Sequence, residues 1–261
     1  MKKIMNFKTT NTLVLVILSL FSVSAFAQRG GAPAGPPPSA QQAAAFDMTG
    51  YWVSVVTEDW RWRMLVAEPG DVENGIPLSP AGRALAEAWR PDDNELESCL
   101  VFGGAGIMRY PGRLHISWED EETLRVDFSA GEQSRLLHFN AAADSTAMTP
   151  SLQGYTTANW YKERQTRGLG FGGPVRSFEG GNLRSVTRNL RPAFLQRNGI
   201  PYSDQTSIED SYKVIDAPNG DRWLIITSVV TDPVNLQQKW ITSTNFKYEE
   251  NGDNWDPIAC R

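Results

Sequence analysis

PGRLHISWEDEETLRVDFSAGEQSRLLHF, residues 111–139, is the stretch that decides the fold of this chain. Apolar residues alternate with polar ones along 114–118 and again along 124–128, and a period of two is typical of strands with one buried face. The acidic run 119–122 and the pair 130–131 lie where turns would separate such strands. We therefore expect three consecutive antiparallel strands here.

The apolar positions also fix how the first two of these strands pair. Only one register places their apolar side chains opposite each other, because a shift by one residue would set apolar side chains beside charged ones. In that register His115 lies opposite Asp127, and Ser117 lies opposite Arg125. Continuing to the third strand places His138 about four residues from His115 along the sheet, roughly 13 Å away at ~3.3 Å per residue.

Residues 1–27 have the pattern of a secretory signal peptide. A basic start is followed by an apolar run over 13–21 and by a small-x-small pattern that ends at Ala27, after which we expect cleavage. No cysteine follows directly, so a lipid anchor is not expected. We expect the mature chain to be periplasmic or secreted, without insertion into a membrane.

The rest of the chain divides into a linker and one domain. Residues 28–46 are rich in Gly, Pro, Ala and Gln, so we predict a disordered linker there. We expect residues 47–261 to form a single β-barrel domain, because their number is large for one domain but normal for a β-barrel or sandwich. Cleavage of the signal peptide would remove three lysines and no acidic residue, which takes the formal net charge from −5 to −8. Such a chain repels nucleic acid and anionic lipid, so neither is expected as a partner.

Cys99 and Cys260 are the two cysteines of the chain. In an oxidising compartment they favour one disulfide, which would hold the C-terminal end against the domain. A loop of about 160 residues would be closed, for which loop-entropy models give about 5 kcal/mol as an upper value. The alternative, a redox pair, is disfavoured because the spacing is not C-x-x-C.

Strand-like patterns recur along the rest of the domain, at 51–57, 59–66, 183–189, 207–214, 223–230 and 240–248. One helix is predicted over 80–89, where Ser79 is a good N-cap and Pro80 a good first residue. About nine or ten strands with one short helix leave no room for parallel β-α-β units. The predicted fold class is therefore all-β, an antiparallel β-barrel, with a β-sandwich as the alternative.

Two segments carry candidate binding residues. Along 59–66, apolar and charged residues alternate, with Trp60, Trp62 and Met64 on one face and Arg61 and Arg63 on the other. We favour a core face and a solvated face, while the alternative is an arginine face that lines a pocket for an anionic group. The segment 191–202 mixes prolines, arginines and apolar residues, so we expect an ordered loop without strands. Such a loop can serve as a lid or as a surface for a protein partner.

Motifs for cofactors and metals are not found. The glycine-rich run 103–106 lacks the ending of a phosphate loop, and there is no Rossmann fingerprint and no G-x-S-x-G elbow. The two histidines of the chain exclude a histidine-rich zinc or copper site. A calcium site at the acidic turn 119–122 stays open, although such a turn is usually only solvated. We expect no cofactor and no metal.

Several segments resemble known families. Gly50-Tyr51-Trp52 resembles the G-x-W opening of lipocalins, which implies a lipocalin-like (calycin-type) β-barrel. Longer segments are similar to those of a family of uncharacterised secreted bacterial proteins, and this resemblance covers most of the mature chain. These segments are TEDWRWRM, MRYPGRLHISW, LRPAFLQRNGIPYS and WDPIAC. The resemblance implies no established activity, so no catalytic residue is transferred from it.

The leading functional hypothesis is a binding protein for a small, largely apolar ligand. Tryptophans would supply the apolar wall, namely Trp60, Trp62 and Trp118. An arginine would hold an acidic head group, namely Arg61, Arg63 or Arg197.

The alternative is a cofactor-free isomerase, hydratase or lyase in the same barrel. His115 would be the general base and Asp127 would orient it, because a carboxylate about 5 Å away across a strand pair can fix the imidazole. Arg125 or Tyr202 would stabilise an oxyanion. We favour a plain solvent-exposed polar pair as the explanation of His115 and Asp127, because such pairs are ordinary on protein surfaces. A protein-interaction module using 191–202 is a third hypothesis.

Overall fold

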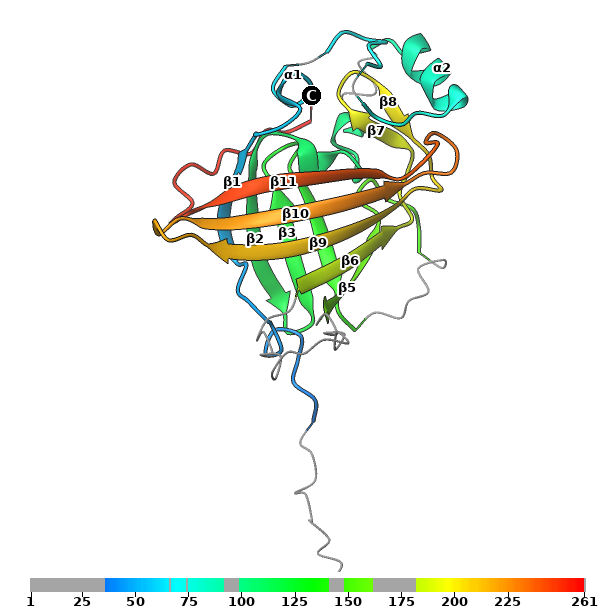
Figure 1. Cartoon of the computed structure of the whole chain (residues 1–261). Coiled ribbons are helices and arrows are strands. Elements are labelled where there is room, and N and C mark those ends of the chain that lie inside the picture. The colour runs from blue at the N-terminus through cyan, green and yellow to red at the C-terminus, as the bar shows by residue number, and fades with distance from the viewer. Residues whose placement is uncertain are drawn as a thin grey trace, which may run out of the picture. The chain divides into compact units, whose positions relative to one another are not determined.

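The computed structural model describes residues 36–65, 67–73, 75–91, 99–140, 148–161 and 182–260. In this part of the chain nine strands close into a barrel in the order β1-β11-β10-β9-β6-β5-β4-β3-β2 (Figure 1). The predicted all-β barrel is confirmed. It is not purely antiparallel, because β4 and β5 pair in parallel. The predicted signal peptide lies outside the described residues.

The barrel strands are β1 (Gly50–Val55), β2 (Arg113–Asp120), β3 (Thr123–Phe128), β4 (Gln133–His138), β5 (Tyr155–Tyr161), β6 (Asn182–Arg188), β9 (Ser207–Asp216), β10 (Arg222–Thr231) and β11 (Trp240–Glu249). The remaining elements are the α-helices α1 (Trp60–Arg63) and α2 (Pro80–Ala88), the 3-10 turns η1 (Leu100–Phe102) and η2 (Ile107–Arg109), and the strands β7 (Ala193–Gln196) and β8 (Ile200–Tyr202). Figure 1 shows α1, α2 and the β7–β8 pair at one end of the barrel.

The pairing of β2, β3 and β4 follows the predicted register. His115 pairs with Asp127 and Ser117 pairs with Arg125, while His138 pairs with Thr123. The residues of these strands that are almost fully buried include Leu114, Ile116, Leu124, Val126, Phe128 and Leu137, and their burial fixes the register. Trp118 and Leu136 are only partly buried. β1 closes the barrel, since it pairs with β2 on one side and with β11 on the other.

Side chains fill much of the barrel interior, as expected for a small barrel. The apolar ones that are at most 2% exposed include Trp52, Leu114, Ile116, Leu124, Val126, Phe128, Leu137, Leu183, Leu224, Ile226 and Phe246. One row of the wall is polar instead. The registers place Ser185 opposite Asp210, Asp210 opposite Ser228, and Ser228 opposite Thr242.

Asp210 in this polar row forms a buried ion pair with Arg135 of β4. Arg135 Nη1 is 3.4 Å from Asp210 Oδ2, and both side chains are almost fully buried. Arg135 Nη2 also donates to the Gly104 carbonyl oxygen at 2.6 Å, and the Ser228 hydroxyl donates to Asp210 at 2.5 Å. Burial raises the pKa of Asp210, while the charge of Arg135 opposes that rise. The pair therefore links β4 to β9 through the interior.

Part of the predicted disordered linker 28–46 is ordered. The Ala40 amide donates to Glu122 Oε1 at 3.2 Å, and Trp160 Nε1 donates to the Ala40 carbonyl oxygen at 2.7 Å. Phe46 packs edge-on against Trp160, with ring centroids 5.4 Å apart. We call residues 38–46 the strap. The composition suggested no core contacts, but small residues let the strap backbone lie close to the turn between β2 and β3.

The segment 191–202 was expected to be a loop without strands, and this is wrong. It forms the antiparallel strands β7 and β8, and Phe194 pairs with Pro201. Proline argued against a strand, but a short edge strand tolerates it because one of its sides needs no hydrogen bonds. Gly199 makes the turn with a φ of 87°, and a Cβ there would lie 2.1 Å from the Trp89 ring. The hairpin is thus packed against the end of α2.

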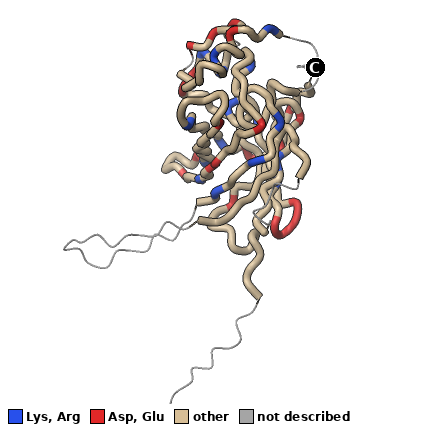
Figure 2. Tube along the Cα trace, turned by 90° about the vertical axis from the view of Figure 1, so that its right-hand side faces the viewer, with Lys and Arg blue, Asp and Glu red and all other residues tan. Residues whose placement is uncertain are grey.

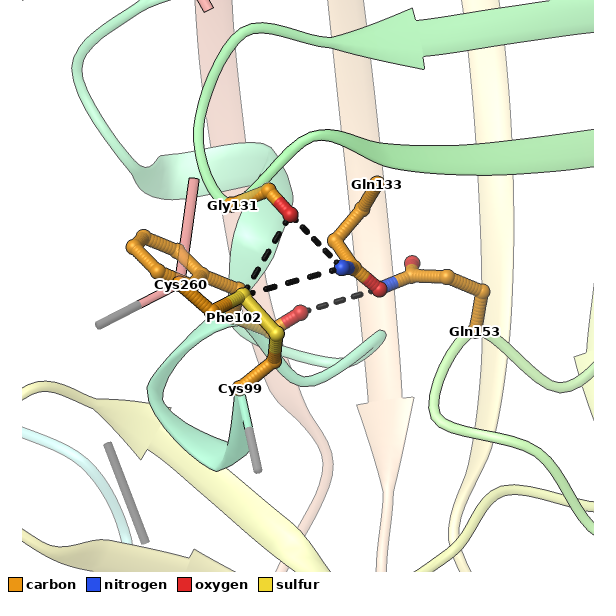
Figure 3. Close-up of a disulfide and its surroundings, with 6 residues drawn as sticks. All are labelled: Cys99, Phe102, Gly131, Gln133, Gln153 and Cys260. Atoms are coloured by element: carbon orange, nitrogen blue, oxygen red, sulfur yellow. Dashed lines mark hydrogen bonds between the residues drawn. A yellow bond between two sulfur atoms is a disulfide. The ribbon is translucent and has the colours of Figure 1, made fainter. Parts of the chain in front are cut away.

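The predicted helix and disulfide are confirmed. Ser79 Oγ accepts a hydrogen bond from the Gly82 amide at 3.0 Å, and Pro80 begins α2. Cys99 and Cys260 form a disulfide with their Cα atoms 5.3 Å apart, at a sequence separation of 161. Figure 3 shows it beside Gly131 and Gln133, where the turn between β3 and β4 lies.

Replacing Cys99 by serine should lower the melting temperature of the oxidised protein. Loop-entropy models give a loss of up to about 5 kcal/mol for a closure of this length. Thermal unfolding followed by circular dichroism measures it. A reducing agent should lower the melting temperature of the wild-type protein towards that of Cys99→Ser and leave the variant unchanged. Equal melting temperatures for the two oxidised proteins would contradict this prediction.

Asp210→Asn should destabilise the barrel strongly. The substitution keeps the shape but leaves Arg135 buried without a counter-charge, which costs about 3–5 kcal/mol. Urea unfolding measures the change in the free energy of unfolding. The control is Glu209→Gln, the outward-facing neighbour on β9, which should change it by less than about 0.5 kcal/mol. A similarly small loss of unfolding free energy in both variants would show that the negative charge of Asp210 is not needed for stability.

Candidate functional site

A cavity of about 30 Å³ lies at the end of the barrel that carries α1. The residues that give it chemical character are Trp62, Arg63, Arg109, Tyr110 and Arg197. We call this site the arginine pocket. Its walls come from α1, from η1 and η2 with the residues beside η2, and from the end of β7 and the connection to β8. Figure 2 shows that basic and acidic residues lie close together along the chain at this end.

Helix α1 places Arg63 in the pocket. Asp59 has a left-handed backbone with a φ of 52°, which turns the chain out of the line of β1. The Arg63 amide then donates to the Asp59 carbonyl oxygen at 3.0 Å, and the single helical turn directs the Arg63 side chain inward. The side chain is almost fully buried, and its Nε donates to the Arg109 carbonyl oxygen at 3.0 Å. Arg63 therefore joins α1 to η2.

Two carboxylates balance most of the buried positive charge. Glu58 Oε1 lies 2.7 Å from Arg63 Nη1 and 3.4 Å from Arg109 Nη1, so it bridges both guanidinium groups. Asp59 Oδ2 lies 2.5 Å from Arg109 Nη2. Both acids are partly exposed, whereas the two arginines are buried.

Arg197 adds a third guanidinium from the hairpin. Its Nη2 donates to the Arg63 carbonyl oxygen at 3.0 Å, and its Nη1 donates to the Tyr110 hydroxyl at 3.3 Å. The guanidinium carbon lies 4.7 Å from the centre of the Tyr110 ring, a cation–π distance. The hairpin thus closes one side of the pocket with a half-buried positive charge.

The electrostatics of the pocket favour an anion. Burial lowers the pKa of Arg63, and the nearby Arg109 lowers it further. Burial likewise lowers the pKa of Arg109. Arg63 Nη2 is buried, and none of the described residues accepts a hydrogen bond from it. A buried donor without an acceptor costs about 1–3 kcal/mol, which an anionic group in the pocket would recover.

The structure brings together three of the six residues that were predicted to bind a ligand, Trp62, Arg63 and Arg197. Trp60 and Arg61 lie outside the pocket. The Trp60 side chain is 58% exposed, and Arg61 pairs with Asp71 at 3.0 Å on the surface.

The predicted strand over 59–66, with a tryptophan core face and a solvated arginine face, is wrong. The segment contains α1, and the buried side chain is Arg63 rather than Trp60 or Met64. A single helical turn accommodates the Trp-Arg repeat as well as a strand does. The ion pair between Arg63 and Glu58 favours the helical turn, because a straight strand would hold these two side chains too far apart.

Trp118 lies at the other end of the barrel. It lines a more open pocket of roughly 320 Å³ together with Phe46 of the strap and the next residue, Asp47. Its ring packs against Phe139, with centroids 5.5 Å apart. The predicted tryptophan wall is therefore divided between two distant places.

His115 and Asp127 lie on the outer face of the barrel, because the apolar residues beside them point inward. His115 Nδ1 is 3.7 Å from Asp127 Oδ2, and Tyr51 stacks on the imidazole with ring centroids 4.4 Å apart. The other oxygen of Asp127 accepts from Arg125 Nε at 2.8 Å and from Ser134 Oγ at 2.5 Å. Asp127 is thus held mainly by Arg125 and Ser134.

Tyr202, the fourth residue of the predicted catalytic group, does not join the other three. It is 1% exposed in β8, and a Cβ at Gly103 would lie 2.6 Å from its hydroxyl oxygen. Burial raises its pKa, so it stays a neutral phenol. The four residues therefore do not form one site.

Arg109 and Tyr110 line the pocket, and Glu58 pairs with two of its arginines, but none of the three was predicted. Arg109 and Tyr110 sit in a non-periodic stretch that follows a glycine-rich run, and no local pattern distinguishes them from surface residues. Glu58 precedes a segment with two arginines, and that charge alternation was the one available signal.

Comparisons of the chain with protein-family models, curated proteins and solved structures gave no match. Among the described residues, no helix has the length and apolar character needed to span a membrane. Within the same residues, no group of three His, Cys, Asp or Glu side chains is placed to hold a metal ion.

Proposed function

We propose that this chain is a periplasmic or secreted binding protein for a small, largely apolar ligand whose acidic group occupies the arginine pocket. The observation that carries the proposal is the buried Arg63 guanidinium, which lines the cavity and has a donor without an acceptor among the described residues. Arginine also suits the role chemically, because its planar fork matches a carboxylate.

Apolar side chains near the pocket support an apolar ligand body. Trp60, Met64 and Leu65 belong to α1 or follow it directly, and they are 58%, 46% and 50% exposed. Exposed apolar residues that cluster beside a polar pocket are typical of binding surfaces. The ligand would therefore place its acidic group inside and its apolar part over α1.

The proposed location rests on two features. The N-terminal pattern predicts export, and the Cys99–Cys260 disulfide fits an oxidising compartment. A ligand reaching such a protein would come from outside the cytoplasm.

Arg197→Gln should weaken the binding of decanoate about tenfold or more, because a hydrogen bond to a charged group contributes about 1.5–3 kcal/mol. Isothermal titration calorimetry with decanoate below its aggregation threshold measures this. Decanol, which has the same chain without the charge, should bind much more weakly to the wild-type protein.

The matched control is Arg61→Gln, which removes the same charge from the exposed side of α1 and should leave decanoate binding unchanged. Melting temperatures show whether each variant is folded. Equal affinities of Arg197→Gln and the wild-type protein, or equal affinities for decanoate and decanol, would refute the proposed site.

A further inference from the structure

We infer that the arginine pocket selects ligands with a single negative charge, namely organic carboxylates, over dianionic groups such as phosphate monoesters, and that Glu58 sets this selectivity. The inference rests on the proposed function and names the ligand class of the same site. Three observations carry it: the charge inventory of the pocket, its size, and the position of Glu58.

The pocket has room for one negative charge. Arg63, Arg109 and Arg197 line it with guanidinium groups. Glu58 and Asp59 do not line it, but their carboxylates form ion pairs with Arg63 and Arg109. The formal balance is one positive charge. A carboxylate neutralises that charge, whereas a dianion leaves a net negative charge in a place where arginines are already desolvated. Uncompensated charge in such surroundings is unfavourable.

The size of the cavity also favours a carboxylate over a phosphate. A volume of about 30 Å³ is small, and it lies between the planar groups of Trp62, Tyr110 and the arginines. A carboxylate is flat and presents two oxygens, which suits the planar donor edge of arginine. A tetrahedral phosphate with three terminal oxygens is bulkier and does not match that planar edge as well.

Glu58 is the residue that fixes the charge balance. One of its oxygens bridges Arg63 and Arg109, so it already occupies donors that a second ligand charge would require. Its other oxygen accepts a hydrogen bond from the Thr57 hydroxyl at 2.5 Å, which holds the side chain in place. The carboxylate thus acts as a built-in anion that repels a doubly charged ligand and tolerates a singly charged one.

Glu58→Gln tests this role, because glutamine keeps the shape and an acceptor oxygen but removes the charge. Decanoate and decyl phosphate are the probes, each titrated by calorimetry at pH 8, where the phosphate is largely dianionic because its second pKa is about 6. The wild-type protein should bind decanoate at least about tenfold more tightly than decyl phosphate, since like-charge repulsion is costly at a desolvated site. Glu58→Gln should gain more affinity for decyl phosphate than for decanoate.

The control is Glu73→Gln. Glu73 is exposed and pairs with Arg83, so this variant has the same change in net charge away from the pocket and should keep the wild-type selectivity. A wild-type preference for decyl phosphate, or equal selectivity in Glu58→Gln and Glu73→Gln, would overturn the inference. Either result would leave the proposed function standing if Arg197→Gln still weakens decanoate. Failure of both probes to bind the wild-type protein would instead refute the proposed function, and the inference with it.

Discussion

The two-residue period of buried side chains along β2 and β3 is the constraint on which the rest of the structure depends. A slip by one residue would turn His115, Arg125 and Asp127 into the barrel and expose the apolar set, so burial allows only the observed register. That register fixes where β2 begins, and the residues just before it form η2. The position of Arg109 in the pocket is therefore a consequence of packing in the barrel wall.

The barrel and its central hairpins could be predicted because the residues that determine them lie close together in the sequence. Neighbouring strands pair through short turns, so the pattern along 114–128 determines both the strands and their register. The pocket could be predicted only in part. Arg63 and Arg197 were identified as candidates from their residue type, but Glu58 and Arg109 meet across 51 residues of chain. The same long-range contact decides that α1 is a helical turn, which the Trp-Arg alternation alone does not reveal.

Among the described residues, the buried arginines lie in two places with different chemistry. Inside the barrel, Arg135 and Asp210 compensate each other, and the hydroxyl of Ser228 and the carbonyl of Gly104 provide further hydrogen bonds. At the barrel end, the arginines outnumber their acidic partners. Each place leaves one buried arginine donor unused, Arg135 Nε and Arg63 Nη2, so the two places differ in charge balance and in the cavity that adjoins Arg63. A balanced ion pair stabilises the fold, whereas an unbalanced cluster of arginines beside a cavity can bind the negative charge of a ligand. This difference separates the scaffold from the candidate site.

The pairing of β1 with β11 has a consequence for how the protein folds. Tyr51 pairs with Glu249, so the first and last strands of the barrel meet across nearly the whole domain. Contacts between residues so distant in sequence form slowly, because the loop entropy must be overcome before they stabilise the chain. A chain that is synthesised from its N-terminus would expose an unpaired edge of β1 until β11 has formed. The barrel can therefore close only after the last strand has formed. Formation of the Cys99–Cys260 disulfide and protection of that edge against aggregation depend on the same step.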